Sequence, residues 1–170
     1  MAAPLNDAIA LLKSDHRKVA DLFDKFEAAK SDSKKKSLAT QICLELTVHT
    51  KIEEDVFYPA CKGVIDGGLW HEAYVEHDGA KVMLAEIEAG DPGDEFYDAK
   101  VKVLSEMIKH HVKEEERRTE GMFAQALRGG LDTHMLGAAM AKLKKDLQKK
   151  YKAAGLPKPP TPSFTGTKLA

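Results

Sequence analysis

Apolar residues recur every three or four positions along five segments of this chain, which is the spacing of helices that bury one face. In the first segment the stripe formed by Ile9, Leu12, Val19 and Phe23 is interrupted by one polar residue, His16. The five segments predict helices over residues of about 6–30, 34–61, 69–89, 92–118 and 133–152. No run alternates apolar and polar residues as a half-buried strand does. The pattern therefore predicts an all-α fold.

Residues that cap or break helices separate these segments. Asn6 is the expected N-cap of the first helix, and Pro59 with Gly63 closes the second. Gly67-Gly68 marks a turn, and Pro92 suits the first turn of a new helix behind an Asp cap. Because the connections are short, neighbouring helices must run antiparallel.

The predicted architecture is an up-down-up-down antiparallel four-helix bundle with an additional C-terminal helix. We expect the bundle in residues 1–125 and an accessory helix packed on it in residues 126–153. Residues 154–170 are rich in Pro, Thr, Ser and Gly and are predicted to be a disordered tail.

Composition narrows the class of protein. The chain has 170 residues, enough for one domain with a real core, and 43% hydrophobic but only 6% aromatic residues, a composition typical of helical proteins. A net charge of −1 gives no electrostatic case for nucleic acid binding. No signal peptide or long apolar segment is evident, so no membrane association is expected.

The two cysteines indicate a reducing compartment. Cys43 and Cys61 are predicted on one helix, where their separation would be roughly 27 Å, too far for a disulfide. We therefore expect a cytoplasmic protein.

Four histidines, His16, His49, His77 and His111, recur at intervals of about one helix length, so that each predicted bundle helix carries one of them. Two of the four open the string His-x-Lys-x-Glu-Glu, at residues 49–54 and 111–116. Residues i and i+4 share one helix face, so each string directs an imidazole and a carboxylate to the same point. Four antiparallel helices with such side chains would enclose a metal site whose ligand atoms are imidazole nitrogens and carboxylate oxygens. The candidate ligands are His16, His49, Glu53, His77, His111 and Glu115.

A surface His/Glu pair that slightly stabilises a helix is the alternative for any single string. In the second string, His110/Glu114 competes with His111/Glu115, but only His111 continues the apolar stripe and matches the first string residue by residue. His71 is expected at the rim of the bundle.

The spacing and order of these residues resemble the hemerythrin-type cation-binding domain, over about residues 5–125. The resemblance implies two non-haem iron ions bridged by Glu53, Glu115 and an oxo, hydroxo or water oxygen. The four histidines would then be terminal ligands. Manganese or zinc could occupy the same donors.

The chain departs from the oxygen-carrying hemerythrins at one position. Those proteins have a His-x3-His pair on the third helix, whereas His77 is flanked by Ala73 and Lys81. One iron should therefore lack a protein ligand, with Tyr74 or Lys81 as a possible supplement. The family's Phe-Pro ending is also displaced, since residues 117–121 precede Met122-Phe123, so the fourth helix is expected to break just after Glu115.

Three functions fit these features. The first is a di-iron protein that binds O₂, peroxide or NO in oxidative-stress response or sensing. The second is an enzyme that decomposes peroxide, handles NO or oxidises ferrous iron. The third is a bundle that uses metal as a structural element and docks a protein partner through its C-terminal helix. The missing histidine favours reactivity over stable O₂ carriage, because an open metal position admits an exogenous ligand.

Overall fold

The computed structural model describes residues 7–166, which are helical throughout apart from turns and a C-terminal extended segment. The elements are α1 (Ala8–Ala28), α2 (Asp32–Ile52), the π-helical segment η1 (Glu53–Phe57), α3 (Tyr58–Cys61), α4 (Gly67–Ala89), α5 (Tyr97–Glu116), α6 (Met122–Arg128) and α7 (Thr133–Ala154). Residues 7–166 contain no β-strand, so the all-α prediction is confirmed.

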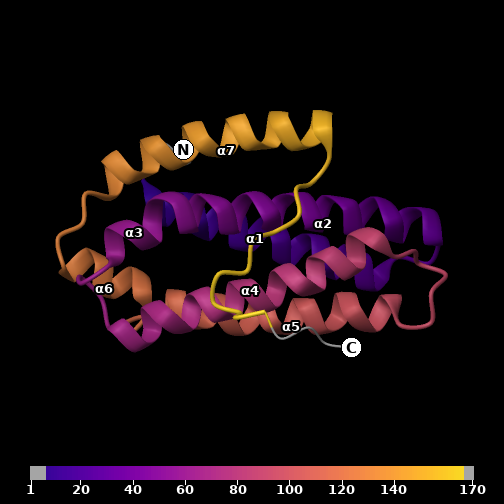
Figure 1. Ribbon diagram of the computed structural model, residues 1–170, viewed down its shortest axis with the longest axis horizontal. Helices are drawn as coiled ribbons and strands as arrows, with labels where there is room; N and C mark the ends of the chain where they lie inside the picture. Colours follow the sequence, from indigo (N-terminus) through magenta and orange to yellow (C-terminus); the bar gives the residue numbers. More distant parts are fainter. Residues whose placement is uncertain (1–6, 167–170) are drawn as a thin grey trace.

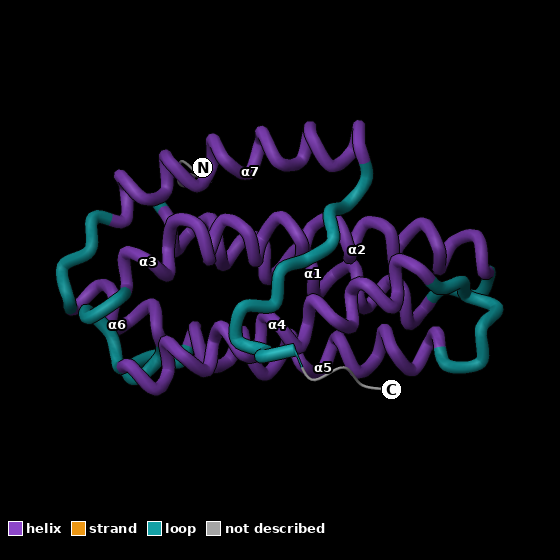
Figure 2. Tube along the Cα trace, in the orientation of Figure 1, coloured by secondary structure: helices purple, strands orange, loops and turns teal. Residues whose placement is uncertain are grey.

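Four long helices form the bundle (Figure 1). α1 packs on α2, α4 packs on α5, and the two pairs meet through the α2–α4 and α1–α5 contacts. α7 lies outside the bundle, along α1 and α2, and the short α6 sits at one end (Figure 2). The predicted four-helix bundle is therefore confirmed.

Short polar side chains begin four of the helices. Asp7 accepts a hydrogen bond from the backbone N–H of Ala10, and Ser31, Asp66 and Asp132 cap α2, α4 and α7 in the same way. The predicted cap Asn6 lies outside the described residues. Because Asp66 is the cap of α4, Gly67-Gly68 forms the first helical turn and not the predicted loop.

The fourth bundle helix begins later than predicted, at Tyr97 instead of near Pro92. The backbone N–H of Asp91 donates to the Asp94 carboxylate, and the N–H of Asp94 donates to the Asp91 carbonyl, both at 2.8 Å. These local bonds satisfy the backbone in a turn and compete with the helix.

A π-helical segment interrupts the second bundle helix, which the sequence predicts as continuous over residues 34–61. The backbone N–H of Tyr58 bonds to the carbonyl of Glu53, five residues back. Pro59 follows immediately and has no N–H to continue the normal ladder. The wider turn accommodates Pro59, and the helix then continues to Cys61.

The core consists of two apolar clusters with a polar layer between them. One cluster holds the first turns of α1 together with α3, α6 and α7, and the other holds the later part of α1 with the adjoining halves of α2, α4 and α5. On α1, Leu12 belongs to the first cluster and Val19 to the second, with buried His16 between them. Cys43 and Cys61 are buried free thiols, one in each cluster.

α5 ends at Glu116, as the displaced motif predicts, but the short helix α6 is not anticipated by the apolar pattern. The turn between them requires glycine, since a Cβ at Gly121 would lie 2.5 Å from the carbonyl oxygen of Arg117. α7 then buries an apolar stripe that includes Leu136, Met140 and Leu147 against the bundle.

Residues 155–166, which belong to the predicted disordered tail, cross from the end of α7 over α2 toward α4 (Figure 1). Buried Asp78 accepts hydrogen bonds from the N–H and hydroxyl of Ser163, at 2.7 and 2.6 Å. The buried ammonium of Lys81 donates to the carbonyl of Pro160 at 2.9 Å. These bonds anchor the segment.

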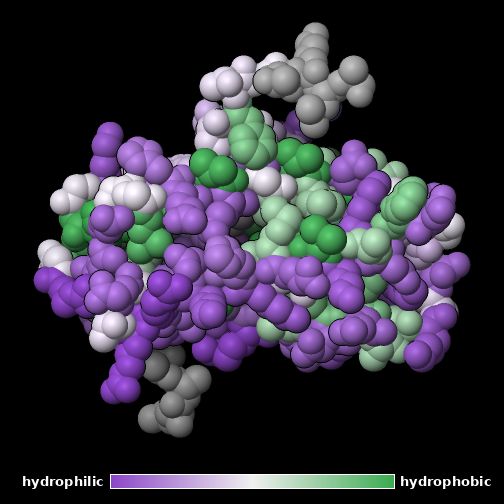
Figure 3. Space-filling model, turned by 90° about the horizontal axis from the view of Figure 1, so that it is seen from below, coloured by the Kyte–Doolittle hydropathy of each residue, from purple (hydrophilic) through white to green (hydrophobic). Residues whose placement is uncertain are grey.

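The surface on the α4–α5 side is mostly hydrophilic, with smaller hydrophobic areas between the charged residues (Figure 3). Within residues 7–166, no helix combines the length and apolar character that crossing a bilayer requires.

Candidate metal centre

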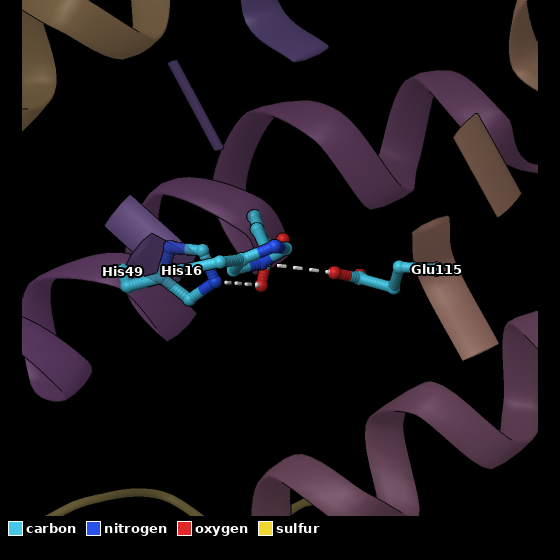
Figure 4. A group of neighbouring side chains, drawn as sticks. His16, His49 and Glu115 are labelled. Carbon is cyan, nitrogen blue, oxygen red and sulfur yellow. Dashed lines mark ion pairs between the residues drawn. The ribbon is translucent and has the colours of Figure 1, made fainter. Parts of the chain in front are cut away.

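The structure brings all six predicted donors together in the polar layer between the two core clusters. They form two overlapping groups that could each hold a metal ion, and every member is buried. The groups are His16, His49, Glu53 and Glu115 in one, and Glu53, His77 and His111 in the other. In Figure 4, His16 and His49 lie side by side while Glu115 approaches from α5.

Two carboxylates connect the groups. Glu53 Oε2 lies 3.2 Å from His49 Nε2 in one group and 3.2 Å from His77 Nε2 in the other. Glu115 directs Oε2 to His16 Nε2 at 3.3 Å and Oε1 to His111 Nε2 at 3.4 Å. Each carboxylate can therefore contact two cations at once, as the bridging role requires.

Each imidazole has an outer carboxylate partner on Nδ1, which leaves Nε2 facing the centre. His16, His77 and His111 pair with Glu116, Glu54 and Glu76 at 2.6, 3.0 and 2.6 Å. His49 Nδ1 lies 3.5 Å from Asp15. This is the arrangement of metal-bound histidines, in which a carboxylate fixes the orientation and tautomer of the ring.

The outer carboxylates form a closed ring around the bundle. Asp15 of α1 faces the histidine of α2, Glu54 of η1 faces that of α4, Glu76 of α4 faces that of α5, and Glu116 of α5 faces that of α1. Each of these acids is the chain neighbour of a candidate ligand. Every bundle helix therefore both presents a donor and orients the donor of another helix.

Two lysines outside the centre reinforce this ring. Lys81 donates to Glu54 at 2.9 Å and to Asp78 at 3.0 Å, so it acts behind the candidate ligands by supporting an outer carboxylate. Lys144 of α7 pairs with Asp15. α7 thus contributes to the geometry at His49.

Several buried donor atoms have no hydrogen-bond partner among the described residues. They include His16 Nε2, Glu53 Oε1 and Glu115 Oε2, and all three face the centre. Orphaned buried polar atoms are rare and costly unless water, an ion or a ligand satisfies them. The residues therefore fit a metal centre, because a cation would supply the missing partner for each.

The charges of the centre are balanced in ion pairs. Burial disfavours the charged imidazole of His16, but the carboxylates of Glu115 and Glu116 outweigh burial and raise its pKa to about 9. Burial also opposes charge on His111, yet Glu115 and Glu76 raise its pKa well above the ordinary value. The Glu115 pKa is well below its ordinary value, because His111 and His16 outweigh burial. A metal cation would compete with these protons.

Tyr58 is a residue of the centre that the sequence analysis missed. Its hydroxyl lies 2.9 Å from Glu115 Oε1, 3.0 Å from His77 Nε2 and 3.2 Å from His111 Nε2. The π-helical segment changes the phase of the helix after Glu53, so Tyr58 faces the same interior as Glu53. Pro59 directly after Tyr58 is the only sequence signal for this irregularity.

A small apolar cavity adjoins the four imidazoles. Val19, Leu46, Ile108 and Val112 form its apolar walls, and it has room for about one water molecule. The cavity can therefore hold a molecule with one or two non-hydrogen atoms.

Replacement of His111 by Ala should lower the metal content, whereas replacement of its neighbour His110 should leave it unchanged. His111 is buried at the centre, but the His110 side chain is 60% exposed and pairs with the outer oxygen of Glu76 at 3.2 Å. Elemental analysis of both purified variants tests this. Loss of metal from His110→Ala with retention in His111→Ala would show that the helix phase is wrong by one residue.

Known proteins resemble this chain in sequence and in fold. The sequence pattern of the hemerythrin HHE cation binding domain matches residues 7–123. A DNA nickase from Nostoc sp. is 30% identical over 106 residues, which cover 62% of this chain but only 30% of that protein. The crystal structure of a hemerythrin HHE cation binding domain-containing protein from Mycobacterium kansasii superimposes with a TM-score of 0.73 at 23% identity, covering 88% of this chain and 94% of that one.

Proposed function

The chain belongs to the hemerythrin HHE cation-binding family, and from this premise we propose that it holds two non-haem iron ions that react with a small oxidant of the peroxide, O₂ or NO class. The family and the His/Glu clusters account for cation binding. We propose iron as the cation and a reaction with a small oxidant as its role.

The donor set supports two ions per chain. Imidazole and carboxylate suit iron, with manganese and zinc as the alternatives. The proposed terminal ligands are His16 and His49 on the first ion and His77 and His111 on the second. Glu53 and Glu115 would bridge the two through oxygens that already face both groups.

We further propose that Tyr58 supplies the donor that the absent third-helix histidine leaves open. Burial and the negative charges of Glu115 and Glu53 hold its pKa well above the ordinary value when no cation is present. The positive charge of a bound cation would instead lower the pKa of Tyr58 and favour its phenolate form. With Tyr58 and both bridging carboxylates counted, the second ion would have five donors and the first would have four, so the open coordination would lie toward His16 and His49.

The cavity beside the imidazoles is the observation that favours a small oxidant. Its size admits peroxide, O₂ or NO, and its apolar walls exclude bulk water. The irons would supply the electrons for reducing the oxidant. The protein would orient the ligands through the outer carboxylates and keep solvent out with Phe57 and Phe123, which pack edge to face at the centre.

Other functions are less well supported. A purely structural metal usually has a closed ligand set, whereas a cavity with room for about one water molecule adjoins the four imidazoles here. The apolar stripe of α7 is buried against the bundle, so a protein partner would meet its lysine-rich face.

The activity named for the Nostoc protein is not part of this proposal, because the chain matches less than a third of that protein and has a net charge of −1. The free cysteines agree with a reducing, cytoplasmic setting.

The test is metal analysis with optical spectra of the protein loaded with ferrous iron and then exposed to peroxide, O₂ or NO. We expect two irons per chain, rapid oxidation and consumption of peroxide. The oxidised protein should show a visible phenolate-to-iron band that Tyr58→Phe removes and Tyr97→Phe, a buried tyrosine of the other core cluster, retains. A stable, reversible oxygenated form without peroxide turnover would instead support O₂ binding, and tight zinc without reactivity would support a structural metal.

A further inference from the structure

Three oxidisable aromatic rings form a continuous line from the centre to the surface. The rings of Tyr58 and Tyr74 lie 5.2 Å apart between centroids, and those of Tyr74 and Trp70 lie 4.8 Å apart. The indole N–H of Trp70 also donates to the backbone carbonyl of Tyr58 at 2.8 Å. At the inner end, Tyr58 contacts the candidate ligands. At the outer end, Trp70 is half-buried beside exposed His71.

We propose that Tyr58, Tyr74 and Trp70 carry single electrons from a surface reductant to the metal centre. The inference rests on the proposed function, since it requires a redox-active metal. Electron transfer between sites slows steeply with distance, so oxidisable rings in contact allow several short steps where one long step would be slow.

The electrons balance as follows. Once peroxide has oxidised the centre, the centre would withdraw one electron from Tyr58, Tyr58 would be refilled from Tyr74, and Tyr74 from Trp70. The one-electron reductant refills Trp70 and is itself oxidised. Tyr74 is half-buried, so its hydroxyl proton can leave to solvent when the ring is oxidised and return when it is reduced. The net change is one electron from the reductant to the metal.

The side chains around the centre make this route specific. On the opposite side, the rings near His16 are Phe123, stacked at 5.9 Å, and Phe57 behind it. Phenylalanine is far harder to oxidise than tyrosine or tryptophan. Within residues 7–166, the oxidisable aromatic rings in contact with the centre therefore lie on one path.

Helix geometry explains how the path is built. Trp70, Tyr74 and His77 follow one another at i, i+4 and i+7 on α4 and share one face. Tyr58 reaches this face because of the π-helical segment. At the surface, the ammonium of exposed Lys62 lies 5.8 Å from the Trp70 ring and would favour a small anionic reductant.

The experiment follows the oxidation of ascorbate by the iron-loaded protein during reaction with peroxide in a stopped-flow spectrometer. Trp70→Phe and Tyr74→Phe should each slow this oxidation severalfold while iron content and melting temperature stay as in the unmodified protein. Tyr97→Phe and Tyr151→Phe are matched controls, because those tyrosines lie outside the line of rings, and they should leave the rate unchanged.

A second readout does not depend on turnover. Peroxide added without reductant should leave an organic radical detectable by electron paramagnetic resonance and oxidation of Trp70, the one tryptophan of the chain, detectable by mass spectrometry. Tyr74→Phe should diminish the oxidation of Trp70. Iron-loaded variants that are reduced and oxidised like the unmodified protein would overturn the electron path alone, whereas a protein that holds no iron would overturn the proposed function.

Discussion

Replacement of Glu115 by Ala is expected to remove most of the metal from both positions. The Glu115 side chain is 1% exposed, and its two oxygens face His16 on one side and His111 on the other. A bridging carboxylate serves both cations, so its loss weakens both sites, in contrast to the loss of a terminal histidine. Glu53→Ala should act in the same way, because Oε2 of Glu53 faces a histidine of each group.

The measurement is iron per chain after loading and desalting. Glu114→Ala is the matched control, since Glu114 lies one residue away and pairs with Arg117 at the surface. Breaking a buried ion pair costs about 3–5 kcal/mol, so Glu115→Gln, which preserves volume and hydrogen bonding, guards against simple unfolding. Full metal occupancy in folded Glu115 and Glu53 variants would contradict the bridging assignment.

The second large effect that we expect is a dependence of the stability of the metal-free protein on pH. The pKa of His16 is raised from 6.5 to about 9, and those of His77 and His111 are also raised, because their carboxylate partners outweigh burial. A raised histidine pKa stabilises the metal-free fold fully below the unfolded pKa, and this contribution is lost as the pH rises through the folded pKa. The stability of the metal-free protein should therefore decline between about pH 6.5 and 9.

At acidic pH, the stability of the metal-free protein should change in the opposite direction and fall as the pH falls. The Glu115 pKa is lowered from 4.5, because His111 and His16 outweigh burial. Its stabilising contribution is present above the unfolded value of 4.5 and is lost as the pH falls through the lower folded value. The metal-free protein should consequently be most stable between these two limits.

Metal affinity should respond in the opposite direction to metal-free stability. Each imidazole must lose its proton to bind a cation, so affinity should rise with pH by about tenfold per unit for each proton displaced. Competition titrations with zinc across this range measure the slope. His16→Gln should reduce it, while His134→Gln, an exposed histidine at the start of α7, should not. An affinity independent of pH would show that the imidazoles are already neutral.

Much of the centre could be predicted because its signals are local. The apolar stripe places His16 on the inner face of α1, and the i, i+4 spacing places His49 with Glu53 and His111 with Glu115. Each of these statements depends only on the geometry of one helix. Ala73 and Lys81 likewise showed that the third helix has no second histidine one turn before or after His77.

The remainder depends on contacts that no local pattern contains. The outer carboxylates join residues 23, 35 and 100 positions apart in the chain, so their ring exists only once the helices are packed. The extended segment after α7 is also placed by distant partners, since Ser163 bonds to an aspartate 85 residues away.

The sequence by itself determined the fold class, the four bundle helices and the six inward donors, because helical periodicity decides which residues share a face. Only the tertiary structure decided that the Tyr58 hydroxyl faces the centre and that two lysines and a ring of acids surround the histidines. A π-helical segment changes the phase of every residue after it, and partners on different helices meet only through packing. Both are consequences of the whole fold, which a periodic pattern along one helix does not encode.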